Sequence, residues 1–140
     1  MKYFTDDYKG DPIKDYWAVF ERIKKHIDPT IVKVFSSGIL HDSRIMSLSV
    51  ADMQQTTDSD FRHDVLLEIC NDTYGGIWKH VKVSKFFVKE IDFTKCGEMQ
   101  YLYGEILRQK KRLIHNFTCW PLESEVYIEC ESMSWENIDC

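Results

Sequence analysis

The stretch "GILHDSRIMSLSV", residues 38–50, marks the point at which the chain changes from helical to strand periodicity. Before it, apolar residues recur at every third or fourth position, which is the spacing of one helix face. Within residues 45–50, neighbouring side chains instead fall into two alternating sets, the pattern of a strand. The sequence therefore predicts a helical front and a β-rich remainder.

Two helices are expected before Gly38. Asp11-Pro12 is a helix-start signal, because an acidic N-cap is followed by proline where a missing N–H costs nothing. The first helix is predicted to continue until Pro29, and its apolar stripe consists of Ile13, Tyr16, Trp17, Phe20, Ile23 and Ile27. A short second helix is expected in residues 29–37, with Gly38 as its end.

Further strands are expected at residues 63–71, 77–93, 98–109, 113–120 and 124–132. Gly75-Gly76 predicts a hairpin turn with positive φ, and a change of parity predicts a bulge or bend near residues 84–85. Residues 98–109 also fit a helix, but Gly104 and the hairpin-like 109–112 favour a strand. The predicted fold class is α+β, a single domain over residues 1–140: an N-terminal amphipathic helix plus a short second helix, packed on an antiparallel β-meander of five to six strands.

Composition limits the classes of function. The 44% hydrophobic content is enough for a core, and a net charge of −5 argues against a general nucleic-acid binder. No apolar run approaches the roughly 20 residues of a membrane span, and no secretion signal is visible, so a cytoplasmic protein without membrane contact is expected. Five cysteines without a C-x-x-C motif predict reduced, mostly buried thiols.

Two His-Asp pairs are candidate metal ligands. His41-Asp42 and His63-Asp64 would serve a small metal-dependent hydrolase if all four side chains converged on one point. Both pairs lie at predicted strand entrances, where adjacent side chains diverge, so a structural role, with the Asp accepting loop N–H groups, is favoured. No nucleophile elbow, phosphate-binding loop or dinucleotide motif is present. We therefore expect no enzyme activity, no catalytic residues, no metal and no cofactor.

The last part of the chain carries an acidic row. All 18 Lys and Arg residues lie at or before Arg112, whereas six acidic residues follow it. Within a strand, the alternate positions Glu123, Glu125, Tyr127, Glu129 and Glu131 would share the outward face. Such a row is either solvated surface or a contact for a basic partner, and lysines at 79, 82, 85, 89 and 95 could neutralise it if their strand lies alongside.

Short motifs spread over most of the chain carry a resemblance. "MKYF" at residues 1–4, "LHDSRI" at 40–45, "MQYLYGEILRQKKRLIHNF" at 99–117 and "EVYIECESMSWE" at 125–136 resemble a family of small bacterial proteins known only as domains of unknown function. The matching features are a Leu-His-Asp turn before a strand and a Tyr-x-Glu-Ile strand before an aromatic-rich hairpin. The resemblance implies no catalytic role.

A looser resemblance is to bacterial toxin-immunity proteins, which are also small, acidic and cytoplasmic. It implies a non-enzymatic binding protein that neutralises a cognate toxin through an acidic surface. The expected contact residues are then Glu123, Glu125, Tyr127, Glu129 and Glu131, and the expected partner is a toxin protein with a basic surface. The alternatives are the hydrolase described above and an accessory protein that binds no ligand.

Overall fold

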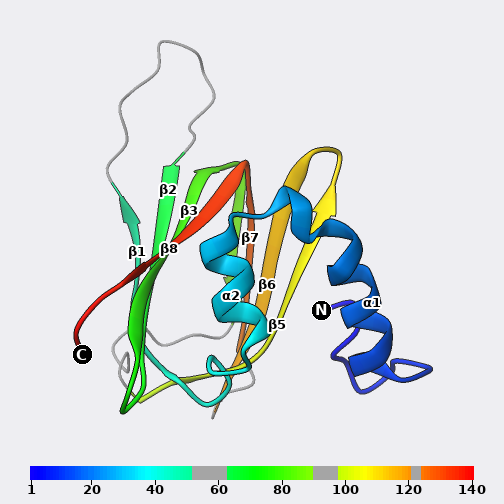
Figure 1. Ribbon diagram of the computed structural model, residues 1–140, viewed down its shortest axis with the longest axis horizontal. Coiled ribbons are helices and arrows are strands. Elements are labelled where there is room, and N and C mark those ends of the chain that lie inside the picture. The colour runs from blue at the N-terminus through cyan, green and yellow to red at the C-terminus, as the bar shows by residue number, and fades with distance from the viewer. Residues whose placement is uncertain (52–62, 90–97, 121–123) are drawn as a thin grey trace.

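A computed structural model describes residues 1–51, 63–89, 98–120 and 124–140. Two α-helices precede the sheet, α1 (Pro12–Ile23) and α2 (Pro29–Ser36), joined by a short 3-10 turn, η1 (Lys24–His26). The strands are β1 (Arg44–Ala51), β2 (His63–Cys70), β3 (Gly75–Val83), β4 (Lys85–Lys89), β5 (Gln100–Gln109), β6 (Arg112–Trp120), β7 (Ser124–Cys130) and β8 (Ser132–Asn137). The predicted α+β class is confirmed (Figure 1).

The predicted number of strands was too low, because the sheet has eight strands in the order β4-β7-β6-β5-β1-β2-β3-β8. Two long passes of the chain bend and each forms two strands: β3 passes into β4 at Ser84, and β7 passes into β8 at Glu131. The simple meander is also wrong, since β1 pairs with β5 and β4 pairs with β7.

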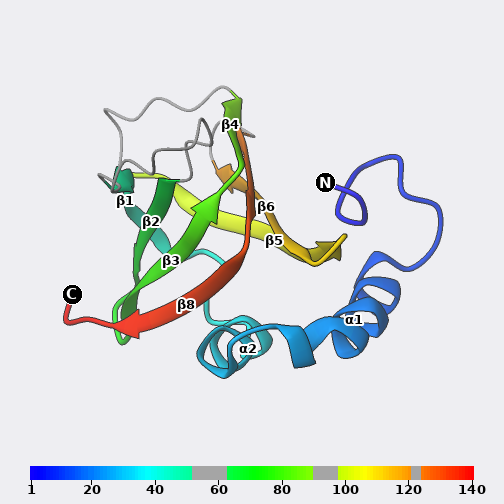
Figure 2. The same ribbon diagram turned by 90° about the horizontal axis from the view of Figure 1, so that it is seen from above.

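The sheet closes on itself. β3 pairs with β8, and β4 pairs with β7, so the two bent passes run antiparallel to each other along their whole length. Backbone bonds bridge the two bends, from Ser84 N to Glu129 O at 2.8 Å and from Glu131 N to Val81 O at 3.0 Å. Figure 2 shows the curled sheet with both helices along one side.

The helices cover the core and are fastened to the sheet by specific hydrogen bonds. On α1, the Tyr16 hydroxyl accepts from Ile106 N at 2.7 Å and donates to Ile106 O at 3.1 Å, which joins α1 to β5. On α2, Thr30 Oγ1 accepts from Trp135 N of β8 at 3.0 Å. Phe35 then meets Trp78 with ring centroids 6.1 Å apart, so the aromatic core lies between the helices and the inner face of the sheet.

The helix starts were predicted correctly, and one apolar position was not. Asp11 caps α1 by accepting from Lys14 N, and Pro12 is the first helical residue. Ile13, expected on the buried stripe, is 62% exposed, because the buried face of α1 begins one turn later at Tyr16. α1 also ends at Ile23, before the 3-10 turn, rather than continuing towards Pro29.

Gly75 and Gly76 do not form the expected turn. The turn precedes them, with Asn71 N donating to Tyr74 O at 2.7 Å and Asn71 Oδ1 accepting from Thr73 N at 3.0 Å. Both glycines lie in β3, where a Cβ on Gly76 would stand 2.1 Å from the Trp135 ring. Their small size therefore serves close packing rather than a positive φ.

The cysteine prediction also needs correction. Cys70 and Cys140 form a disulfide, while Cys119 and Cys130 are fully buried. Cys96 lies outside the described residues. The pair could not be deduced from spacing, because the two cysteines are 70 residues apart and meet only when β3 and β8 have paired. Within the described part of the chain, no helix is long and apolar enough to cross a membrane.

Candidate functional site

The acidic row lies on β7, and its predicted alternation is confirmed. Ser124, Val126, Ile128 and Cys130 are fully buried, whereas the residues between them are partly exposed on the opposite face. Because successive strand side chains point to opposite faces, Glu125, Tyr127 and Glu129 share the outward side. Glu123, the first predicted member, lies outside the described residues.

Strand β4 lies beside this row and brings basic side chains to it. The register pairs Lys85 with Glu129 and Lys89 with Glu125. Directly opposed residues in an antiparallel pair point to the same face, so each carboxylate has a lysine as its cross-strand neighbour. Lys85 and Lys89 thus lie alongside the acidic row, as the hypothesis of neutralisation by lysines requires. Lys95 lies outside the described residues.

Further cations contact the acidic side chains. Arg112 Nε lies 3.5 Å from Glu129, and Lys82 Nζ lies 3.8 Å from Glu131. The Met1 ammonium lies 2.7 Å from Glu125. Partial burial raises the pKa of Glu125, but hydrogen bonds from the Met1 ammonium and Asn116 outweigh it and leave this pKa below its usual value. The row is therefore a set of compensated charges rather than an acidic patch.

An aromatic pair, exposed at Phe87 and partly exposed at Tyr127, lies at the centre of these charges. Phe87 of β4 is 58% exposed and stacks on Tyr127, with ring centroids 4.8 Å apart and planes inclined by 9°. We call Phe87, Tyr127, Lys85, Lys89, Glu125 and Glu129 the β4–β7 face. The sequence signal was present but not used: if Phe86 and Val88 face inwards, then Phe87 must face outwards.

The two His-Asp pairs do not converge. His41 Nδ1 lies 2.6 Å from Leu102 O, in the segment before β1. Asp64 pairs with Ala51 at the far end of β1, about 23 Å away at the usual rise of a strand. Among the residues that the structure describes, no three His, Cys, Asp or Glu side chains are grouped so that they could hold a metal ion.

Asp64 instead supports the bulge in β3. Its Oδ1 accepts from Lys82 N at 3.0 Å, and Lys82 has a φ of 53°. The register between β2 and β3 shifts at this point, so β3 has a bulge at residues 81–82. The bend predicted near residues 84–85 is confirmed at Ser84, where β3 passes into β4. This is the structural role that the sequence favoured for the aspartate.

The core contains a polar chain that the sequence did not predict. His80 Nδ1 lies 3.0 Å from Val65 O, His80 Nε2 lies 2.8 Å from His115 Nδ1, and His115 Nε2 lies 3.0 Å from the Tyr101 hydroxyl. The Val65 carbonyl can only accept, so His80 donates to it. With both imidazoles neutral, His115 then donates to His80, and Tyr101 donates to His115. In this arrangement every ring nitrogen has a hydrogen-bond partner.

Burial explains the charge state of this chain. Desolvation lowers the pKa of His80 to about 4, against the weaker opposing effect of its backbone hydrogen bonds. Burial, and then the neighbouring His80, also lower the pKa of His115 well below its usual value. The Trp78 ring covers His115 with centroids 3.9 Å apart. Both histidines are fully buried, so this series of hydrogen bonds organises the core and offers no group to a substrate.

Comparison of the chain with models of protein families and with curated proteins finds no match, so both resemblances drawn from the sequence stay predictions.

Proposed function

We propose that this chain is a non-enzymatic binding protein, an immunity protein that neutralises a cognate toxin by covering it with the β4–β7 face. The observation that carries the proposal is the Phe87–Tyr127 pair, a large apolar contact exposed among charged side chains. Protein interfaces obtain most of their binding energy from a few such aromatic residues, surrounded by polar contacts that exclude water.

The proposal differs from the sequence-based expectation in what attracts the partner. Glu125, Glu129 and Glu131 already have cations beside them, so a strongly basic partner is not required by charge repulsion. In this proposal the aromatic pair provides affinity, and the alternating Lys and Glu residues provide orientation and specificity. The partner is a protein with an apolar recess for Phe87 and a matching pattern of both charges.

The experiment begins with proteins encoded next to this gene, because an immunity gene is expected beside its toxin gene. Each product is tested for binding by calorimetry and for rescue of cell growth on co-expression. Phe87→Ser is expected to weaken binding by on the order of tenfold or more, which corresponds to about 1.4 kcal/mol. Ile13→Ser is the matched control, since Ile13 is equally exposed but lies on α1.

Charges are tested separately from the aromatic pair. Reversal of Glu125, Glu129 or Glu131 to lysine would place two lysines beside each other, so Gln is used at all three positions. If these charge variants bind more weakly than the wild type, and if the difference in affinity is larger at low salt, the charges have the orienting role. If no adjacent product binds, or if Phe87→Ser and the Glu variants bind as tightly as the wild type, the proposed function is wrong.

A further inference from the structure

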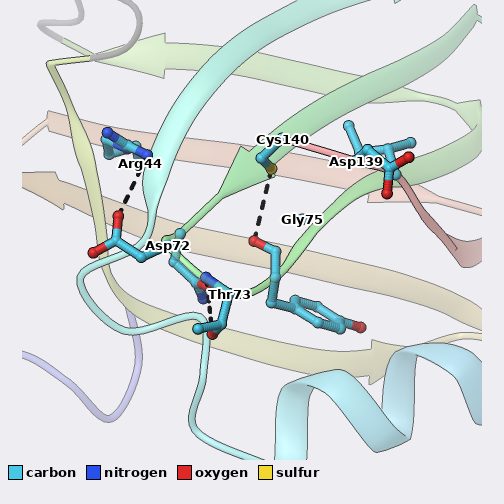
Figure 3. A pocket seen from close by; sticks show the side chains of 9 residues that line it. Arg44, Asp72, Thr73, Gly75, Asp139 and Cys140 are labelled. Carbon is cyan, nitrogen blue, oxygen red and sulfur yellow. Dashed lines mark hydrogen bonds and ion pairs between the residues drawn. The ribbon is translucent and has the colours of Figure 1, made fainter.

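Cys140, which forms the disulfide with Cys70, lines a polar pocket at the opposite end of β3 from the β4–β7 face. The pocket has a volume of about 420 Å³, and its lining includes Arg44, Asn71, Asp72, Tyr74, Asp139 and Cys140 (Figure 3). Its size would admit a small molecule to the sulfur of Cys140.

The two cysteines differ in access, because Cys140 lines the pocket and Cys70 does not. Cys70 is only 4% exposed, at the end of β2, whereas Cys140 is an exposed residue. Disulfides exchange when a thiolate attacks one sulfur and expels the other. An incoming thiolate therefore reaches Cys140 Sγ, and the sulfur that it expels belongs to Cys70.

Arg44 is placed to favour this direction of attack. It stands directly opposite Cys70 in the β1–β2 register, so the two side chains share one face of the sheet. A nearby guanidinium stabilises a thiolate, and a more stable thiolate is a faster leaving group. Asp72, 3.8 Å from the Arg44 guanidinium, is fully exposed and offsets this effect only in part.

We propose that this disulfide is a reversible latch operated by low-molecular-weight thiols, with Cys140 as the residue that becomes modified. A thiolate RS⁻ attacks Cys140 Sγ, the Cys70–Cys140 bond breaks, and the products are the mixed disulfide RS–Sγ of Cys140 and the Cys70 thiolate. A second RS⁻ attacks the mixed disulfide and gives RSSR and the Cys140 thiolate. Two thiols are thereby oxidised to RSSR while the protein disulfide takes up the two electrons.

The latch holds the segment that follows β8. Ile138 N donates to Gly75 O at 3.0 Å. Cys140 Sγ packs against Gly75 so closely that a Cβ on Gly75 would lie only 2.0 Å from the sulfur. After reduction the Cys140 thiol can donate to the Tyr74 carbonyl oxygen, 3.7 Å away (Figure 3). Reduction therefore releases residues 138–140 without removing a buried apolar side chain, and the β3–β8 ladder remains.

The other described cysteines do not compete for the thiol. Cys119 and Cys130 are fully buried, and burial raises the pKa of Cys130 to about 12. Exchange requires a thiolate and access, so it is confined to the latch. In a reducing compartment, a disulfide of this kind is more often a sensor than a staple.

The experiment exposes the folded protein to glutathione at a series of reduced-to-oxidised ratios, followed by alkylation and mass spectrometry. Cys96 is replaced by Ser so that labelling reports only the described cysteines. The expected results are a glutathione adduct at Cys140, labelling at Cys70, and faster amide exchange at residues 138–140 while the β3–β8 amides stay protected. Cys70→Ser, which removes the expelled sulfur, should make the Cys140 adduct accumulate.

Arg44→Gln should slow the first exchange several-fold, whereas Lys79→Gln, a matched loss of charge outside the pocket, should not. The proposal is overturned if reduction is no faster than global unfolding, because the bond is then a structural staple. It is equally overturned if the first adduct forms at Cys70, or if Arg44→Gln and Lys79→Gln are reduced at the same rate.

Discussion

Mild acid should destabilise this protein through its buried histidines. In the unfolded chain His80 takes up a proton below about pH 6.5, whereas in the folded protein its pKa is about 4. Between these values the unfolded state binds more protons than the folded state, so the free energy of unfolding falls as the pH falls. The stabilisation by the neutral imidazole is complete above pH 6.5 and is lost through this window.

The magnitude follows from the size of the window. Each unit of pKa difference corresponds to about 1.4 kcal/mol, so His80 alone should remove about 2 kcal/mol between pH 7 and pH 5. His115 contributes in the same direction, because burial lowers its pKa as well. A loss of this size is a large fraction of the roughly 5 to 15 kcal/mol by which a domain is stable.

Urea denaturation at half-unit steps from pH 7.5 to pH 4.5 measures the effect, with the imidazole carbon-bound protons followed by NMR. His80→Gln should flatten the dependence on pH even if it lowers stability throughout. The control is Ile13→Ser, an exposed substitution that removes no titrating group. A free energy of unfolding that stays level from pH 7 to pH 5, or a ring of His80 that titrates near pH 6.5, would refute the reasoning.

Three further predictions concern stability, each measured by urea denaturation. Glu105→Gln should cost about 2 kcal/mol, because the buried Glu105 carboxylate accepts the backbone N–H groups of residues 2–4 and the amide can satisfy fewer of them; equal stability would contradict this role. Gly76→Ala should cost several kcal/mol by displacing the Trp135 ring, whereas Gly38→Ala, with a φ of 74° and open space around it, should cost only about 1 kcal/mol; similar losses would show that packing is not the cause. Cys140→Ser should cost roughly 4 kcal/mol under oxidising conditions and nothing under reducing ones.

Local features of the chain were predictable because they depend on neighbouring residues. Asp11 and Pro12 suffice to begin α1, and the alternation in β7 assigns Glu125 and Tyr127 to one face. The 109–112 hairpin was also predicted, and Lys110 and Lys111 form it with positive φ values of 50° and 66°. Each of these signals is contained in a short segment of the sequence.

Features that depend on strand order were not predictable. The acidic row looks unpaired until β4 is placed beside β7, and no local pattern specifies that pairing. His80 and His115 are 35 residues apart and meet only in the closed sheet. The charge compensation of the acidic row and the hydrogen bond between the two histidines thus depend on residues that are distant in the sequence.

Closure of the sheet through its two bent strands bears on how the chain folds. The contacts that complete the ring join Gly76 to Asn137, and thus span nearly half of the chain. Contacts between residues that are distant in the sequence require the chain to lose loop entropy before the contacts stabilise it, so they slow folding. During synthesis, β3 must wait for β8, and in the meantime Gly76–Val81 keep backbone groups available to other chains. We therefore expect folding yield to depend on how quickly β8 follows, and less on the helices, which can form as soon as they are made.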